Sequence, residues 1–325
     1  MAAERLQEIA AALQLAVFAT SAAVWFHAIQ RIRSGKSLIP FEPRRQVPWD
    51  GAWVLFSIAL YWCLAALVNI GAARAHIAGL PAGERAAALA NPEAVLGASP
   101  AFMLRMIQSD SAAKLITMCL VLFVLNRVKR ADEYDFGIGF ERFATRIAQG
   151  AYVFFLALLP TLLLQFVMVE IVGIKYDHAL IEAVRSPTGG ALVFWSGFAA
   201  VVAAPLVEEF LFRGILQGWL ERVSAEVQAR EDDERALRLA EGMEQQPPVA
   251  ASPESWRHSG MPIFFSSAIF ALVHLPQWAA IGPLFIFGIG LGYLYRQTHS
   301  IWPGIVMHFL LNGLTMTVLL LGAKP

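Results

Sequence analysis

Long runs of apolar residues, separated by short polar connections, are the dominant pattern along this chain. A helix needs about 20 apolar residues to cross a bilayer, and only helices and closed barrels satisfy the backbone in lipid. Runs of this length, or close to it, cover residues 9–29, 51–73, 111–126, 149–173, 190–220, 263–275, 278–295 and 301–321. The pattern predicts an all-α, polytopic membrane protein with about eight transmembrane helices.

Composition supports this class and excludes others. Of 325 residues, 57% are hydrophobic and 15% are charged, which is too apolar for an ordinary soluble chain of this length. The formal net charge is zero, so no overall field favours nucleic acid as a partner. Glu4, Arg5 and Glu8 precede the first run, so it lacks a basic leader and is expected to be a retained span. The expected location is an integral, multi-pass position, in the plasma (inner) membrane if the host is bacterial.

Basic residues set the expected orientation. The first, third and fifth connections each contain five Lys or Arg residues, whereas the second contains three and the fourth two. By the positive-inside rule the odd connections are cytoplasmic and both termini lie outside.

Two connections divide the chain. Residues 1–150 are expected to form N-terminal helices with an amphipathic connection on the outer face at 75–106. Residues 151–325 form a second unit, interrupted at 222–260. That stretch is dense in charge and then rich in proline, which predicts a solvated, partly disordered cytoplasmic linker.

Charged residues inside the fifth run are the first sign of chemistry. Glu208, Glu209 and Arg213 lie at predicted membrane depth, where each charge costs at least ~2.5 kcal/mol on insertion scales. Glu209 and Arg213 are spaced i and i+4, so they share a helix face and can neutralise one another. Glu208 lies about 100° further round the helix, which leaves it for another element of the fold.

The sixth and eighth runs contain further polar residues. His274 follows Phe270 by one helical turn, and His308 precedes Asn312 by one turn. Three separate spans therefore carry polar groups, and these groups are most simply satisfied if they converge on one buried site.

Two chemistries fit such a site. Glu208 with His274 can take a proton from water, while His308 and Asn312 stabilise the oxyanion that forms on a peptide carbonyl. Alternatively, Glu208, His274 and His308 can hold a catalytic zinc ion, since two histidines and a glutamate form a known zinc set. The spacing does not choose between them, because the residues lie on different helices.

The motifs E-E-x-x-x-R, F-x-x-x-H and H-x-x-x-N occur in this order at residues 208–213, 270–274 and 308–312. In this the chain resembles the CPBP family of intramembrane proteases, which contains type II CAAX prenyl endopeptidases and proteins similar to lysostaphin resistance protein A. The resemblance implies a bundle with an intramembrane active-site cavity open to the cytoplasm and to lipid, with residues 151–325 as the protease core. It implies water activation by Glu208 and His274, oxyanion stabilisation by His308 and Asn312, and support from Glu209, Arg213 and Phe270.

The expected partners are a peptide or protein substrate, lipid-modified or not, and membrane lipids. The Glu208–His274 mechanism requires no cofactor, and the alternative set requires zinc. Two other classes of protein compete with the endopeptidase. One is a non-catalytic immunity or scaffold protein of the same fold, and the other is a transporter that uses these residues to bind a proton or cation. Intact motif positions favour the enzyme, and the internal repeat typical of transporters is not found in the sequence.

Overall fold

The computed structural model describes residues 2–43, 45–91, 99–174, 190–241, 256–275 and 277–321. Every regular element in these ranges is helical, which confirms the all-α fold. Within these ranges, seven helices are long and apolar enough to cross a membrane, and an eighth, shorter apolar helix covers Gly260–Leu272. The predicted set of about eight spans is therefore confirmed, with one span shorter than the others.

The membrane helices agree with the predicted runs and mostly extend beyond them. They are α1 (Ala2–Arg33), α2 (Gly51–Ala78), α5 (Pro100–Lys129), α7 (Phe143–Phe166) with its π-helical continuation η1 (Val167–Ile171), α12 (Trp256–Leu272), α13 (Trp278–Thr298) and α14 (Trp302–Leu320). The fifth span belongs to one 51-residue helical stretch. Its parts are α9 (Gly190–Phe198), η2 (Ala199–Ala203), α10 (Ala204–Glu209), η3 (Phe210–Gln217) and α11 (Gly218–Ala240), where η denotes π-helical backbone.

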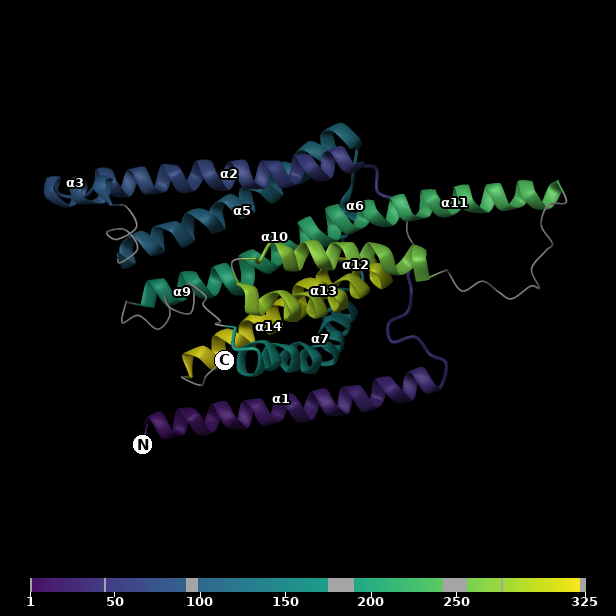
Figure 1. Ribbon diagram of the computed structural model, residues 1–325, viewed down its shortest axis with the longest axis horizontal. Coiled ribbons are helices and arrows are strands. Elements are labelled where there is room, and N and C mark those ends of the chain that lie inside the picture. Colours follow the sequence, from purple (N-terminus) through teal and green to yellow (C-terminus); the bar gives the residue numbers. More distant parts are fainter. Residues whose placement is uncertain are drawn as a thin grey trace.

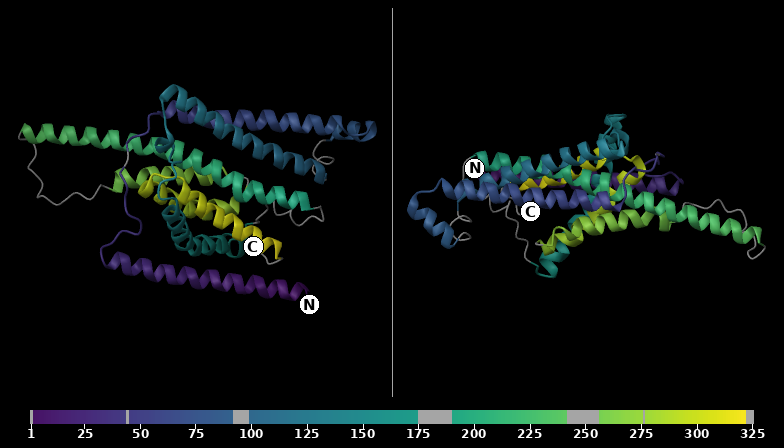
Figure 2. Two further views of the ribbon diagram at one scale, coloured as in Figure 1. Left: turned by 180° about the vertical axis from the view of Figure 1, so that it is seen from behind. Right: turned by 90° about the horizontal axis from the view of Figure 1, so that it is seen from above.

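The long helices run side by side in the bundle (Figure 1). Helices α2 and α5 pack on one another at one edge, and α1 lies at the opposite edge against α7 (Figures 1 and 2). Between them lie α10, α12, α13 and α14. The start of α1 and the end of α14 lie at the same end of the bundle, as an even number of crossings requires.

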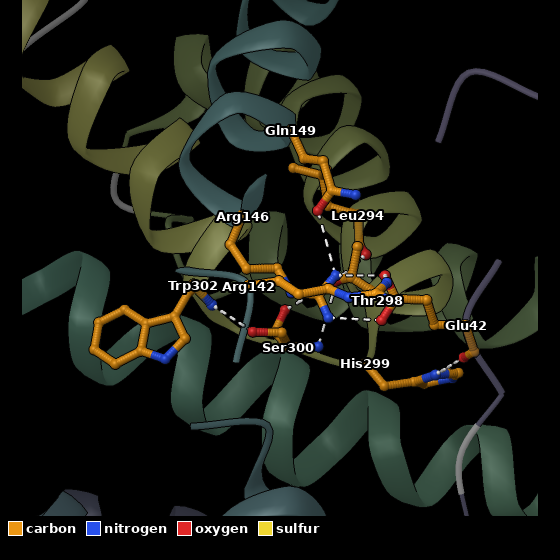
Figure 3. Close-up of polar contacts among 9 residues, drawn as sticks. All are labelled: Glu42, Arg142, Arg146, Gln149, Leu294, Thr298, His299, Ser300 and Trp302. Atoms are coloured by element: carbon orange, nitrogen blue, oxygen red, sulfur yellow. Dashed lines mark hydrogen bonds and ion pairs between the residues drawn. The ribbon is translucent and has the colours of Figure 1, made fainter. Parts of the chain in front are cut away.

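Polar residues from several connections meet at the other end of the bundle (Figure 3). Arg146 donates two hydrogen bonds to Glu42, and the Nδ1 atom of His299 lies 2.7 Å from the carbonyl oxygen of Glu42. The Arg146 hydrogen bonds hold the pKa of Glu42 below its ordinary value. Arg222 donates to the carbonyl oxygens of Val47 and Trp49. The first, third, fifth and seventh connections therefore share one end, as the predicted orientation requires.

Two predicted connections take a more regular form than expected. Residues 222–240 continue helix α11, and only residues 242–255 of the predicted linker lie outside the described ranges. Ion pairs between Arg222 and Glu226 and between Glu234 and Arg238, both at i and i+4, favour this helix. In the outer segment 75–106, α3 (Ala82–Ala90) is the one short helix described, and residues 92–98 lie outside the described ranges.

Two hydrophobic clusters position the motif helix. The first joins Trp49, Val121, Leu125 and Phe136 to Phe210, and so attaches the N-terminal helices to η3. The second contains Phe154, Leu158, Phe270, Phe287 and Met307 and attaches α7, α12, α13 and α14 to one another. Because Phe210 and Phe270 lie beside the motif residues, both clusters hold the site in place.

Candidate functional site

The motif glutamates end a short α-helical segment between two π-helical ones. Glu208 and Glu209 are the last residues of α10, η2 precedes it and η3 follows it. Pro205 lacks the N–H that a continuous α-helix would use, which favours a change of hydrogen-bond register there. Such π-helical turns occur often at functional sites, since they turn side chains relative to a regular helix.

Glu209 and Arg213 form the buried rear of the site. Arg213 Nε lies 3.4 Å from Glu209 Oε2, and both side chains are at most 1% exposed. The guanidinium also lies over the ring of Phe270, with 4.6 Å between Cζ and the ring centroid. The predicted i, i+4 ion pair is therefore confirmed. None of the guanidinium nitrogens has a hydrogen-bond partner among the described residues, so Arg213 depends on Glu209 and Phe270 for compensation.

Helix α14 approaches Glu209 at a glycine. A Cβ atom at Gly304 would lie 2.5 Å from Glu209 Oε2 and 3.2 Å from its Cδ atom. Since real Cβ atoms do not approach so closely, any larger residue at position 304 must displace the carboxylate.

We expect Gly304→Ala to lower the peptidase activity that the sequence predicts for this site by about 100-fold. A shift of about 1 Å in a positioned group has effects of this size. The matched control is Gly313→Ala in the same helix, where the nearest atom to a new Cβ is 3.8 Å away. Turnover of the two variants checks this. Equal activity of Gly304→Ala and wild type would show that the position of Glu209 is irrelevant.

His308 lies between the two glutamates. Its Nε2 atom is 3.9 Å from Glu208 Oε2, and its Nδ1 atom is 3.5 Å from Glu209 Oε1. The Glu208 side chain is 20% exposed, whereas that of Glu209 is 0% exposed. The predicted convergence of the fifth and eighth spans is thus present, and Glu208 is the carboxylate that an incoming molecule can reach.

His274 approaches the same site from another direction. It lies in a turn just beyond the end of α12, with its Nδ1 atom 2.8 Å from the carbonyl oxygen of Phe270. A carbonyl oxygen only accepts hydrogen bonds, so Nδ1 carries the proton in this contact. When the ring is neutral, Nε2 is then an acceptor, and no described residue donates to it. The Phe270 ring contacts both His274 and His308, with ring centroids 5.2 and 5.8 Å apart.

The structure places a second histidine beside Glu208, since His308 lies within ion-pair range of it. The expected pairing of Glu208 with His274 stays a prediction. Within the described part of the chain, His274 makes no ion pair or hydrogen bond with Glu208, and its Nδ1 atom contacts the carbonyl oxygen of Phe270. His274 and His308 both contact the Phe270 ring.

Asn312 lies one turn beyond His308 on α14, as predicted. Its Nδ2 atom donates a hydrogen bond of 2.7 Å to the carbonyl oxygen of Ala200 in η2. An amide nitrogen carries two hydrogens, so one donor remains after this contact. The contact also fixes the side-chain orientation of Asn312 against the motif helix.

The zinc alternative needs Glu208, His274 and His308 to gather round one point. Among the described residues, no group of three or more His, Cys, Asp or Glu side chains is placed to hold a metal ion. In this conformation the three residues do not fit a zinc site.

Two pockets of the described structure are lined by residues other than these side chains. One, of about 170 Å³, is at the end of the bundle where the connections meet and is lined by Arg45, Glu221, Arg222 and His299 among others. The other is an apolar groove of about 370 Å³ between the α9–η2 segment and α14, lined by Phe194, Val201, Met316 and Leu320 among others.

Sequence reasoning missed two residues that the structure brings to the site. Gly304 gave no signal, because its close contact with Glu209 depends on how α14 packs. Lys114 lies inside a predicted span and interacts electrostatically with Glu208. A charge at membrane depth was the signal that could have identified it.

The fold and the site define a multi-pass helical membrane protein whose spans converge on a buried cluster of carboxylates, arginine and histidine. Residues 190–314 match the family model described as type II CAAX prenyl endopeptidase, Rce1-like. The match confirms the predicted resemblance over this part of the chain. It contains all seven motif residues and leaves α1 to α7 outside. No curated protein and no solved structure gives a significant match to the chain.

Proposed function

We propose that this protein is an intramembrane endopeptidase that hydrolyses a peptide bond near the membrane surface, with Glu208 as the base that activates water. The observation that supports the proposal is the pairing of a partly exposed Glu208 with His308, behind which Glu209 and Arg213 are fully buried. A carboxylate at membrane depth is energetically costly. Its presence in a reachable position therefore favours a functional role.

In the proposed reaction Glu208 takes a proton from water while the water oxygen bonds to the peptide carbonyl carbon. The negative charge that develops on the carbonyl oxygen is stabilised by His308 and by the second N–H of Asn312. The C–N bond then breaks as the proton passes from Glu208 to the departing amine. His274 has a free Nε2 acceptor and is assigned to hold the water on the side of Phe270.

Removal of the Asn312 amide tests the oxyanion role. We expect Asn312→Ala to lower kcat by about 10²- to 10³-fold with a small change in KM, since an oxyanion donor acts mainly in the transition state. Steady-state kinetics of the purified variant checks this. A variant that changes KM alone would assign Asn312 to substrate binding instead.

A lipid-modified substrate is supported by the apolar groove beside Asn312. Met316 lies one turn beyond Asn312, and Val201 follows Ala200, whose carbonyl binds the Asn312 amide. A lipid chain in this groove would therefore hold the attached peptide close to the proposed oxyanion site. CAAX processing is the activity that the matched family name describes, and it is part of this proposal.

A peptide screen tests the proposed function. The purified full-length protein is incubated with peptides that include prenylated and unmodified versions of each sequence, with and without a chelator, and products are identified by mass. Cleavage that persists in chelator supports the proposed reaction. Loss of cleavage on chelation, restored by zinc, would assign Glu208, His274 and His308 as metal ligands. Peptide binding without cleavage would favour the scaffold protein.

A further inference from the structure

A lysine in the middle of α5 faces the site. Lys114 lies seven residues before Val121 and eleven before Leu125, so the three side chains share one helix face. Val121 and Leu125 are fully buried in the cluster that contains Phe210. Helix α5 packs against α9, η2 and α10. The face that carries Lys114 is thus the one turned toward the motif helix.

Lys114 also lies inside a membrane-length helix. Fifteen residues separate it from Lys129 at the basic end of α5, which corresponds to about 22 Å along a helix. Its ammonium therefore cannot reach the surface at the Lys129 end, and the predicted apolar run begins at residue 111, three residues before it. Its charge must be compensated by groups within the bundle.

One group contacts the ammonium, and two others lie on helices packed against α5. Asp110, one turn earlier on α5, has its Oδ2 atom 2.8 Å from Lys114 Nζ. Glu208 belongs to α10 and Tyr61 to α2, both of which pack on α5 and carry these groups within electrostatic range of Lys114. An ammonium carries three N–H donors. Asp110 provides the one hydrogen-bond partner of this ammonium among the described residues, so donors remain for a ligand.

Lys114, Glu208 and Asp110 are the partly exposed charged groups of the cluster, and Lys114 is the cation among these three. Their side chains are 18%, 20% and 36% exposed, respectively. Arg213, by contrast, is buried under Glu209 and Phe270 and cannot contact an incoming peptide. A peptide held with its reacting carbonyl near Glu208 therefore meets a positive charge at Lys114.

We infer that Lys114 binds a carboxylate of the peptide substrate and thereby selects which peptide bond reaches Glu208. The inference rests on the proposed endopeptidase function. A carboxylate that enters the bilayer needs a cation, and Lys114 supplies one beside the water-activating group. Because the ammonium is fixed relative to Glu208, the cut falls at a constant number of residues from the bound carboxylate.

Two sources of carboxylate are possible in chemical terms: the free C-terminus of the peptide, or an Asp or Glu side chain. Three peptides of one sequence separate them. They end in a free carboxylate, in an amide, or in an amide with a glutamate placed at the same distance from the scissile bond. Each has a reduced, uncleavable bond at that position, so that binding is measured without turnover.

Affinities are measured for the full-length wild type, Lys114→Met and Lys114→Arg. We expect the wild type to bind a carboxylate peptide roughly 10- to 100-fold more tightly than the amide peptide, as charge-assisted hydrogen bonds do. Lys114→Met should remove this preference, and Lys114→Arg should keep most of it. Asp110→Asn, which removes the competing anion, should strengthen the preference. If the wild type binds carboxylate and amide peptides equally, or if Lys114→Met retains the preference, the inference is wrong.

A purely structural role for Lys114 would weaken the binding of all three peptides alike, and that result would overturn the inference as well. If Lys114→Met fails to fold, the double variant Asp110→Asn/Lys114→Met removes both charges together and is expected to show the same loss of preference. Cleavable versions of the peptides separate this inference from the proposed function. Cleavage without carboxylate preference rejects only the role of Lys114, whereas carboxylate preference without cleavage rejects only the enzyme.

Discussion

Glu208→Gln is expected to lower kcat for peptide cleavage by about 10²- to 10⁴-fold, the usual contribution of a general base. The amide keeps the shape of the side chain and cannot accept the proton of water. The Glu208 side chain contacts His308 at 3.9 Å and is not part of the Glu209–Arg213 ion pair. The substitution leaves that pair intact, so the free energy of unfolding and KM should change little.

The control for this prediction is Glu170→Gln in η1, where the carboxylate is exposed and lies in another span. It should keep activity within about twofold of the wild type, since it touches no group that acts in the transition state. Steady-state rates on one peptide check both variants. Comparable rates for Glu208→Gln and Glu170→Gln would remove Glu208 from the mechanism.

The largest expected effect on stability comes from separating the buried ion pair. Glu209→Gln and Arg213→Met should each lower the free energy of unfolding by about 3–5 kcal/mol, because each leaves an uncompensated charge in a site without water access. The pair is 0–1% exposed, and the guanidinium has no hydrogen-bond partner among the described residues that could replace the carboxylate.

The double variant Glu209→Gln/Arg213→Met should lose less than the sum of the two single losses, since it removes both charges. Glu226→Gln is the matched control: it breaks an i, i+4 pair with Arg222 that is exposed, and should cost at most about 1 kcal/mol. Denaturant titration in mixed micelles measures all four variants. Single losses no larger than that of the control would show that the pair does not stabilise the fold.

Much of the fold could be predicted from the sequence, because apolar length decides where a helix can cross a bilayer. The sixth span ends earlier than the predicted apolar run, which extended to residue 275. Its helix ends at Leu272, before His274, and the sequence has Pro276 there, which disfavours helix at the preceding residue. Helix α11 could also have been extended from the i, i+4 charge spacing, which favours helix over disorder.

The site could be predicted only in part. Spacing along one helix correctly paired Glu209 with Arg213, since that geometry is local. Which histidine lies beside Glu208 depends on how α14 and the end of α12 are rotated against α10, and spacing within a span contains no information on that rotation. The same limit applies to Gly304, whose importance comes from a contact between two helices.

The most direct test of water-activated peptide hydrolysis is a single-turnover reaction in H₂¹⁸O. The purified protein is reconstituted in lipid vesicles and mixed with a membrane-anchored peptide at a lower molar amount. The masses of the products are then measured by mass spectrometry. Water activation by Glu208 predicts cleavage with one ¹⁸O atom in the new carboxylate from the first turnover. An unlabelled carboxylate in the first turnover would indicate attack on the peptide by a protein carboxylate, whose oxygen stays in the product, and an intact peptide would contradict the assignment as an endopeptidase.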